Sequence, residues 1–386
     1  MNMQVNLVEP EIDNRPVLIL TPGGLENGGG IGRLIGYMVE AWHGKNRPPI
    51  KIIDTRGPNR ETHGLITVLA WPFFMVQSLA RILLHAPCQP LLHINLAAGS
   101  STLRKIIVVR FGRMLGLDMI IHLHDPDYGA TYMRFPRLAR PAVRAMFLSA
   151  AKVLVLGKAA ETTMTGLLQV PADQVEIVPN GVPAPASVAA LDNLTEPRIL
   201  FLGYLSRRKG VHDLIDALAR PELHALTWSA TLAGSGSHQP TFVEQAARAG
   251  VQHRLTFPGW VDRERTRALL TGADILVLPS YAEGMAMSVL EAMAFGLCVI
   301  CTPVGALAEV VEDGVSGLVV PPGNVDELAA AIGKAIRDPE LRRRLGRGAR
   351  EAFMRAYNID DYPDRIIAVY KGARLRKTKL TTSATG

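Results

Sequence analysis

The sequence predicts an α/β protein of two similar-sized domains, each built on an open, mainly parallel β-sheet. The 386 residues are about twice the length of an average domain. Short apolar runs that do not alternate with polar residues recur along the chain, which is typical of parallel strands covered on both faces. Helical patterns separate these runs; Val211, Leu214, Ile215 and Leu218, for example, fall on one face of a helix.

Six strands are expected in each half of the chain. In the first half they are expected at Val17–Leu20, Ile52–Ile53, Leu91–Leu96, Met119–Leu123, Val153–Leu156 and Val175–Val178. In the second half they are expected at Ile199–Leu202, Thr227–Leu232, Leu255–Phe257, Ile275–Leu278, Leu297–Cys301 and Gly317–Val320. The alternation of strand and helix predicts parallel pairing, and two such sheets imply a cleft between their carboxyl edges.

The break between the domains is expected in Val182–Pro197, a stretch rich in Pro and Ala that lacks periodicity. We assign residues 1–184 to the first domain, 185–197 to the linker and 198–365 to the second domain. Residues 366–386 are expected to form a C-terminal helix or tail.

The composition excludes several classes of protein. Hydrophobic residues make up 48 % and charged residues 20 %, so the chain is not disordered by composition. Three cysteines cannot form a disulfide scaffold and favour a reducing compartment. The N-terminus has acidic residues where a signal peptide is basic and then apolar. The best candidate for a membrane span, Leu65–Ala80, is too short and contains Pro72. We therefore expect a cytoplasmic protein.

The net charge of +7 is unevenly distributed. Residues 1–190 carry 18 Lys and Arg against 13 Asp and Glu, whereas residues 191–386 carry 24 against 22. A basic first half predicts an acidic partner: phosphate, nucleic acid or anionic lipid. The segments Trp71–Leu84 and Arg134–Arg144 combine apolar and basic residues and could lie on an anionic bilayer. An ordinary core helix and a solvated face explain them equally well, and the basic stretch Arg374–Lys379 could join this surface or be a disordered end.

The most informative stretch runs from Pro279 to Gly296, where a strand is followed by a loop and then by a helix that opens near Ala286. The free amides of that first turn, with the helix dipole, can bind an anion. Glu283 and Glu291 flank this anion site, so each is expected to bind hydroxyls: Glu283 those of a sugar at one end of a pyrophosphate, Glu291 those of a ribose at the other. The alternative is two solvated acids, but the spacing of eight residues after a buried strand favours a binding site.

These residues carry a resemblance to a known family. Glu283 and Glu291 match the E-x7-E motif of the retaining GT-B glycosyltransferases of family 4. Gly203–Gly210, Val304–Glu309 and Asp313–Val319 are similar to other segments of that family. The resemblance covers most of residues 150–360 and, more loosely, 15–130. It implies a GT-B fold of two Rossmann-like domains, the first on the acceptor side and the second binding a nucleotide sugar. The implied reaction transfers a sugar, with retention, to an acceptor hydroxyl.

The resemblance also implies roles for single residues. Glu291 would bind the ribose, and Glu283 the donor sugar. Arg208 and Lys209 would face the diphosphate and stabilise the charge that builds on it as the glycosidic bond breaks; the alternative is a solvated basic turn. Further donor contacts are expected at Gly284, Met285, Ala286, Met287, Ser288 and Val289.

Two first-domain loops are expected to complete the site. The glycine turn Gly28–Gly32 is neither a P-loop nor a G-x-G-x-x-G motif, because Arg33 and Ile35 fill the last positions, but it permits close backbone approach to a phosphate or sugar. The family has a similar loop facing the donor, which makes Gly29 and Gly30 candidate donor contacts; the alternative is a flexible turn. His122 and His124 end a strand, and the family commonly has a histidine here at the acceptor side. His124 matches better and is a candidate catalytic residue.

Three other features are interpreted more conservatively. Asp125 and Asp127 form an Asp-x-Asp pair, but one pair of acids is not a metal site, so no metal or other cofactor is expected. Cys298 and Cys301 lie in an apolar strand on opposite faces and are expected to be buried structural residues. The segment Leu91–Lys105 resembles one found in polysaccharide-building members of the family, where it helps to form the acceptor side.

Taken together, these features predict a retaining, metal-independent glycosyltransferase, with a donor of the GDP-mannose or UDP-glucose type. The expected acceptor is a glycan or lipid-linked glycan of exopolysaccharide or lipopolysaccharide synthesis, reached at the membrane surface from the cytoplasmic side. One alternative is a nucleotide-sugar epimerase or phosphorylase on the same fold. A basic nucleic-acid-binding protein is the non-enzyme alternative, disfavoured because aromatic residues are only 6 % and no binding motif is present, so no nucleic-acid partner is expected.

Overall fold

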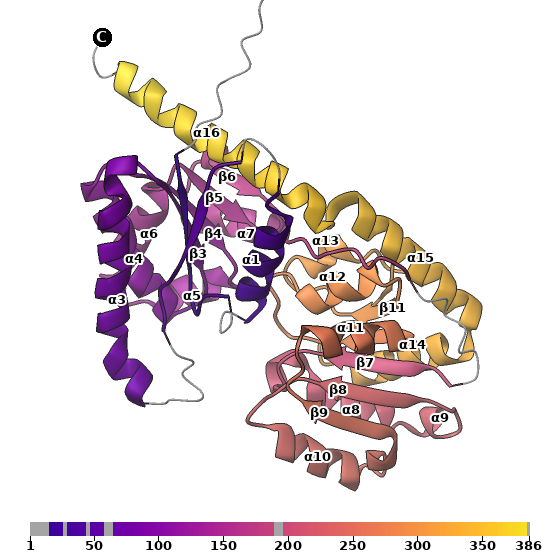
Figure 1. The fold of residues 1–386 in the computed structure, drawn as a ribbon. Coiled ribbons are helices and arrows are strands. Elements are labelled where there is room, and N and C mark those ends of the chain that lie inside the picture. Colours follow the sequence, from indigo (N-terminus) through magenta and orange to yellow (C-terminus); the bar gives the residue numbers. More distant parts are fainter. Residues whose placement is uncertain (1–14, 26–28, 44–46, 58–64, 189–195, 384–386) are drawn as a thin grey trace, which may run out of the picture.

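The protein contains two α/β domains that meet at the carboxyl edges of their sheets (Figure 1). The fold is taken from a computed structural model, which describes residues 15–25, 29–43, 47–57, 65–188 and 196–383. Within this part of the chain each domain contains one sheet of six strands, and the strands pair in parallel throughout. The predicted α/β class with two parallel sheets is confirmed.

The first sheet has the strand order β2-β1-β3-β4-β5-β6, so its topological switch point lies between β1 and β3. Its strands are β1 (Val17–Thr21), β2 (Ile50–Asp54), β3 (Leu91–Leu96), β4 (Asp118–Leu123), β5 (Lys152–Val155) and β6 (Val175–Ile177). Its helices are α1 (Gly29–Ala41), α3 (Leu65–His85), α4 (Ser100–Met114), α5 (Tyr128–Arg134), α6 (Arg140–Leu148) and α7 (Lys158–Thr162).

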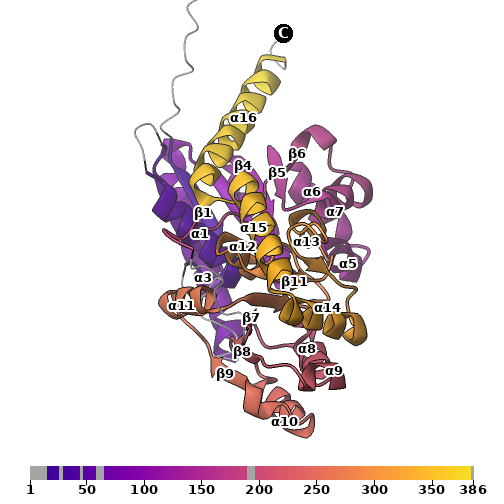
Figure 2. The ribbon, with the colours of Figure 1, turned by 90° about the vertical axis from the view of Figure 1, so that its right-hand side faces the viewer.

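The second sheet has the order β12-β11-β10-β7-β8-β9. Its strands are β7 (Arg198–Leu202), β8 (Ser229–Ala233), β9 (Leu255–Gly259), β10 (Ile275–Leu278), β11 (Cys298–Cys301) and β12 (Leu318–Val319). Its helices are α8 (Val211–Leu218), α9 (Pro221–His224), α10 (Gln239–Arg248), α11 (Arg263–Gly272), α12 (Met287–Ala294), α13 (Leu307–Val310), α14 (Val325–Arg337) and α15 (Pro339–Ala356). Helix α15 packs along α12 and β11 (Figure 2).

All twelve expected strands are present, with ends shifted by a few residues. Strands β1, β3, β4, β10 and β11 are buried at every position, which explains their unbroken apolar runs. The edge strand β9 alternates between half-buried and exposed residues and runs on to Gly259, beyond the expected end at Phe257. Cys298 and Cys301 are buried and unpaired, as expected of structural cysteines.

The chain returns to the first domain at its C-terminal end. Helix α16 (Tyr362–Ser383) follows α15 and packs against α1 and β4 (Figure 1). Tyr362, Ile366, Tyr370 and Ala373 are buried on one face of it. Just before α16, the Ile359 amide donates to the Val182 carbonyl and the Val182 amide donates to the Tyr357 carbonyl, so two segments of chain connect the domains. Residues 189–195 of the expected linker and Gly28 of the glycine turn lie outside the described residues.

Helix α3 covers the candidate membrane span Leu65–Ala80 and carries Pro72 within it. Among the described residues, no helix is both long enough and apolar enough to cross a bilayer.

Candidate active site

The basic turn after β7 and the acidic loop after β10 form one ion-paired cluster, as expected for neighbouring strands that end at the same sheet edge. The Lys209 Nζ donates to Glu283 Oε1 at 2.5 Å, and the Ser280 hydroxyl donates to the same oxygen at 2.6 Å. Both ion-pair partners are largely buried, with 13 % of the Lys209 side chain and 7 % of the Glu283 side chain exposed. Glu283 Oε2 makes no hydrogen bond within the described residues, so this oxygen remains available to a ligand.

Two glycines allow these loops to approach each other. Gly210 has a φ of +69°, and a Cβ there would lie 2.0 Å from the Pro279 carbonyl oxygen. Gly305 has a φ of +57°, and a Cβ there would lie 1.7 Å from the Glu283 carbonyl oxygen. Both positions therefore require glycine for conformation and for space. The Arg208 Nη1 donates to the Ala282 carbonyl at 2.5 Å, which joins the basic turn to the acidic loop a second time.

Helix α12 opens directly beyond this loop. Ala286 is its N-cap, and no side chain of the described residues caps its first amides. Uncapped first-turn amides and the helix dipole favour an anion at this position. Its residues Met287–Ala294 are all buried. Gly30 of the glycine turn lies opposite, since a Cβ on it would be 3.7 Å from Met287 Cγ. Gly29 has a φ of +57° and no neighbour within 4 Å of its Cβ position.

The strand ends of the first domain lie against the same loop. A Cβ on Gly284 would be 2.9 Å from the His124 carbonyl oxygen, so His124 and Gly284 are in contact across the domains. The His124 Nε2–H donates to Asn95 Oδ1 at 2.9 Å. Behind His124, the rings of His122 and His93 follow in sequence, and His93 Nδ1 lies 2.8 Å from Tyr370 Oη of α16. Burial lowers the pKa of His124 to about 3, so its imidazole is neutral.

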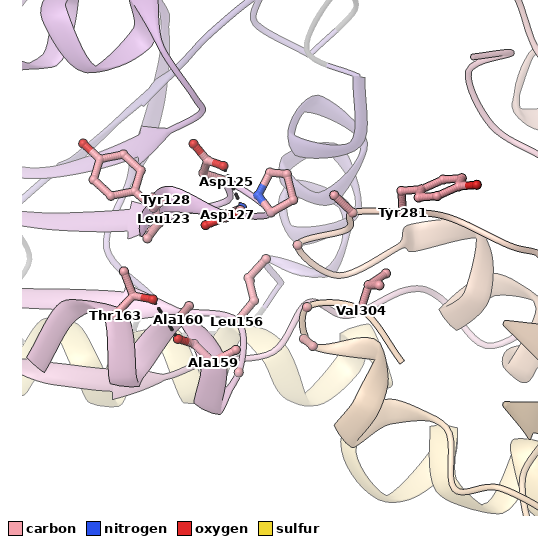
Figure 3. A pocket seen from close by; sticks show the side chains of 16 residues that line it. Leu123, Asp125, Asp127, Tyr128, Leu156, Ala159, Ala160, Thr163, Tyr281 and Val304 are labelled. Carbon is pink, nitrogen blue, oxygen red and sulfur yellow. Dashed lines mark hydrogen bonds between the residues drawn. The ribbon is translucent and has the colours of Figure 1, made fainter. Parts of the chain in front are cut away.

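A cavity of about 310 Å³ lies between the two sheet edges (Figure 3). The first domain lines it with the β4–α5 turn and the start of α7, and the second domain with Tyr281, Ala282, Gly284 and Val304–Ala306. Asp125 and Asp127 face this cavity, and burial raises the pKa of Asp125.

Both aspartates also shape the β4–α5 turn. Asp125 accepts from the Asp127 amide at 2.9 Å and from the Thr131 hydroxyl at 2.8 Å, and Asp127 accepts from the Ala130 amide at 2.9 Å. Within the described part of the chain, no three His, Cys, Asp or Glu side chains are grouped so that they could hold a metal ion.

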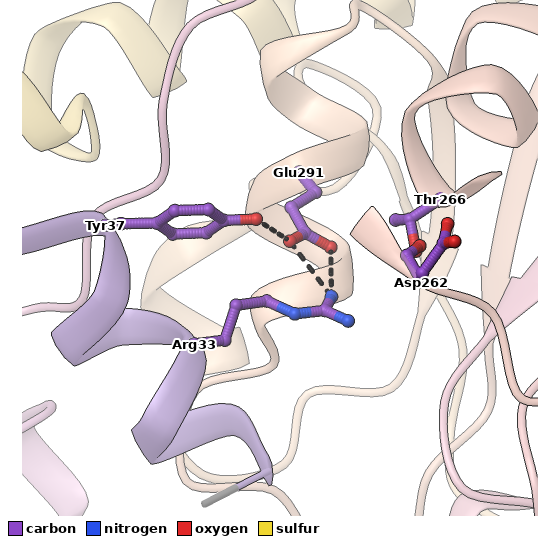
Figure 4. Close-up of polar contacts among 5 residues, drawn as sticks. All are labelled: Arg33, Tyr37, Asp262, Thr266 and Glu291. Atoms are coloured by element: carbon purple, nitrogen blue, oxygen red, sulfur yellow. Dashed lines mark hydrogen bonds and ion pairs between the residues drawn. The ribbon is translucent and has the colours of Figure 1, made fainter. Parts of the chain in front are cut away.

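Glu291 is the second acid of the pair, and the first domain holds its side chain (Figure 4). The Tyr37 hydroxyl donates to Glu291 Oε1 at 2.9 Å. The Arg33 Nη1 lies 3.1 Å from both Oε1 and Oε2. Burial raises the pKa of Glu291, and the positive charge of Arg33 is the largest opposing effect.

Comparison with known proteins agrees with this geometry. Residues 187–352 match the family model described as "Glycosyl transferases group 1". This region of the chain is therefore similar to the group 1 glycosyl transferases. The chain is 26 % identical over 276 residues to an alpha-D-kanosaminyltransferase of Streptomyces kanamyceticus, a match that covers 67 % of this chain and 72 % of the relative. Of the curated relatives it matches, it spans between about half and three quarters of the length.

Two solved structures share the whole fold. Sucrose-phosphate synthase from Thermosynechococcus elongatus superposes with a TM-score of 0.74 at 21 % identity, covering 92 % of this chain and 98 % of that protein. Anabaena HepE, solved in complex with UDP and glucose, superposes with a TM-score of 0.72 at 19 % identity, covering 92 % and 99 %. These glycosyltransferase structures confirm the expected GT-B fold.

The structure brings the expected site residues together in two groups. Glu283, Lys209, Arg208 and the start of α12 form the first group, on the second domain. His124 and the glycine turn approach that group from the first domain. Their functional roles remain predictions.

Sequence reasoning missed Arg33, Tyr37 and Asn95 as site residues. In the sequence, Arg33 was noted only because it occupies a position that a G-x-G-x-x-G motif would give to glycine. Arg33 and Tyr37 are four residues apart, directly after the glycine turn, so both lie on one face of α1. This spacing was the signal that could have identified them as site residues. Asn95, two residues after His93 on β3, was visible only within a looser resemblance.

Proposed function

We propose that this protein is a retaining glycosyltransferase that moves a sugar from a nucleotide diphosphate sugar to a hydroxyl of a glycan or lipid-linked glycan. The observation that supports it most is the Lys209–Glu283 pair beside the uncapped start of α12. This arrangement offers positive charge for a diphosphate and a carboxylate oxygen for sugar hydroxyls at adjacent positions. Glu291, eight residues further on, would receive the ribose.

In this proposal the bond between the anomeric carbon and the β-phosphate oxygen breaks while the acceptor oxygen bonds to the same carbon and gives its proton to the departing phosphate oxygen. Negative charge then builds on the departing diphosphate. Lys209, Arg208 and the α12 amides would stabilise that charge, and preorganised groups of this kind supply a large share of catalysis. Because these groups provide positive charge, the proposed reaction requires no metal. Glu283 Oε2 would accept from a donor sugar hydroxyl.

The acceptor would enter the cavity between the sheet edges. Its lining includes the carboxylates of Asp125 and Asp127, which suit the hydroxyls of a sugar. With two carboxylates in that lining, a phosphate carried by the acceptor would bind outside this cavity. His124, whose imidazole is neutral and whose backbone carbonyl lies against Gly284, would stand at the acceptor side.

A surface of the first domain suits a lipid-linked acceptor. Helices α3, α4 and α6 pack side by side, α3 on α4 and α4 on α6. They expose apolar residues that include Phe73 at 67 %, Leu84 at 77 % and Met114 at 81 %. Arg110 and Arg113 are exposed on the same helix as Met114. Apolar and basic side chains together favour an anionic bilayer, so we propose peripheral attachment on the cytoplasmic side, in exopolysaccharide or lipopolysaccharide synthesis.

A panel of nucleotide sugars that includes GDP-mannose and UDP-glucose tests the proposal. The purified protein is incubated with each one, with and without a simple sugar acceptor, and the released nucleotide diphosphate is measured. Release from one donor, with an α-linked product by NMR, is the expected result. Release that requires inorganic phosphate would indicate a phosphorylase, and an isomerised sugar still attached to its nucleotide would indicate an epimerase. Turnover of none of the donors would overturn the proposal.

A further inference from the structure

The carboxylate of Glu291 is held by two residues of the opposite domain, both on α1 (Figure 4). Oε1 accepts from the Tyr37 hydroxyl and from Arg33 Nη1, whereas among the described residues Oε2 accepts only from Arg33 Nη1. A carboxylate offers about four lone-pair sites. The two α1 side chains occupy three of these sites, so Oε2 keeps one that a further donor can use.

The surroundings of Glu291 make Arg33 important for its charge. Glu291 is only 4 % exposed, and an unpaired carboxylate at such a position is strongly disfavoured. Another cation on this side, Arg263 of α11, is paired with Glu40, with Arg263 Nη2 at 2.7 Å from Glu40 Oε2, and its guanidinium lies 4.8 Å from the Tyr37 ring centre. Asp262, the N-cap of α11, also lies on this side of Glu291, with its carboxylate on the Arg265 amide (Figure 4). Direct neutralisation of Glu291 therefore comes from Arg33.

We propose that Arg33 and Tyr37 are positioning residues of the nucleotide site. They keep Glu291 ionised and turned so that Oε2 accepts a hydrogen bond from a ribose hydroxyl. This inference rests on the proposed function, in which Glu291 receives the ribose. It adds that ribose recognition depends on both domains: the second domain supplies the carboxylate, and the first supplies its charge partner and its orientation.

The proposal has a direct consequence for ligand selectivity. Hydrogen bonds from hydroxyls to an ionised carboxylate are stronger than those to a neutral carboxyl group. Loss of Arg33 removes the main effect that lowers the Glu291 pKa, so more of this carboxyl is protonated as the pH falls. The protein should then lose its preference for a ribose over a 2′-deoxyribose, and lose it most at low pH.

The test measures this preference by calorimetry with UDP, GDP and ADP and with their 2′-deoxy counterparts, at pH 6 and pH 8. The wild type should bind one of these ribonucleotides roughly tenfold or more tightly than its deoxy form. Arg33→Ala should lose most of that ratio at pH 6 and recover part of it at pH 8. Arg33→Lys should retain part of the ratio, because it keeps the charge. Tyr37→Phe removes one hydrogen bond to Glu291 and should lower the ratio at both pH values. This variant provides the test if Arg33→Ala does not fold.

Glu40→Gln is the matched control, because it breaks the other α1 ion pair to the second domain without touching Glu291. It should leave the ratio unchanged. An equal fall in Glu40→Gln would mean that loosened domain contact, and not Glu291, explains the effect, and would overturn the inference. An undiminished ratio in both Arg33→Ala and Tyr37→Phe would also overturn the inference. Tighter nucleotide binding by Arg33→Ala would overturn it too, because Arg33 would then compete with the ribose for Glu291. A wild type that binds no nucleoside diphosphate refutes the proposed function itself.

Discussion

Replacement of Lys209 by methionine should destabilise the protein, because it leaves Glu283 as a buried carboxylate without a cation. The Glu283 carboxylate then keeps one partner, the Ser280 hydroxyl. Breaking a buried ion pair from one side costs about 3–5 kcal/mol, and both side chains here are close to fully buried. Methionine keeps the apolar stem, so the change falls mainly on the charge.

A double-mutant cycle separates the pair from its surroundings. Glu283→Gln alone should also destabilise, whereas the double variant should lose less than the sum of the two single variants. We expect a coupling energy of about 2 kcal/mol, within the range seen for contacting residues. Urea unfolding followed by circular dichroism at pH 7 measures all four free energies of unfolding. Single effects that add to within about 0.5 kcal/mol would show that the Lys209–Glu283 contact contributes nothing and would refute this reasoning.

The same variant tests the proposed catalytic role. At temperatures where Lys209→Met is folded, kcat should fall by about 10²–10³, as for loss of one preorganised donor. The donor KM should change less, because the developing charge on the β-phosphate exists only in the transition state. A raised KM with kcat unchanged would make Lys209 a ground-state anchor.

Four other outcomes are expected. Glu291→Ala should weaken nucleotide diphosphate binding by about 1.5–3 kcal/mol in calorimetry; unchanged affinity would remove this residue from the ribose role. Sugar transfer should continue in EDTA; loss of transfer that Mn²⁺ restores would direct attention to Asp125 and Asp127. In flotation assays the protein should bind anionic vesicles better than neutral ones, and less so in 1 M salt, where the Debye length is about 3 Å instead of about 10 Å at 0.1 M; equal binding to both would argue against the basic surface. Gly305→Ala should lower the urea midpoint, because its Cβ would overlap the Glu283 carbonyl; an unchanged midpoint would contradict the close contact between these two loops.

The strands and the α12 turn could be predicted because their signals are local. An unbroken apolar run such as Leu91–Leu96 marks a strand buried on both faces, and all six of its residues are buried. Edge strands are less clearly marked, since one side of β9 faces solvent and its pattern alternates. The Lys209–Glu283 contact was not among the expectations, because it depends on β7 and β10 being neighbours in the sheet, and the strand order is not written in the local pattern.

The contacts between domains could not be predicted in the same way. Arg33 and Glu291 are 258 positions apart and belong to separate domains. Their contact depends on how the surfaces of two folded domains fit together. The hydrophobic periodicity of the sequence predicts helices and strands but not such a fit. The return of α16 is a different case: buried Tyr362, Ile366, Val369 and Tyr370 repeat at helical spacing, so the sequence contained the signal for an amphipathic helix without indicating the surface it covers.

The negative charges of Glu283 and Glu291 are compensated by cations from different domains. This difference determines how each carboxylate responds to movement of the domains. Glu283 is paired within its own domain, through a lysine on the adjacent turn. Glu291 is paired across the domains, through an arginine on α1. With both carboxylates compensated, neither opposes a diphosphate at the start of α12, where uncapped amides and the exposed Arg208 leave a positive field. The pairing of Glu283 survives any movement of one domain relative to the other, whereas that of Glu291 does not. Separation of the domains would therefore weaken the ribose end of the site while leaving the ion pair at the sugar end intact.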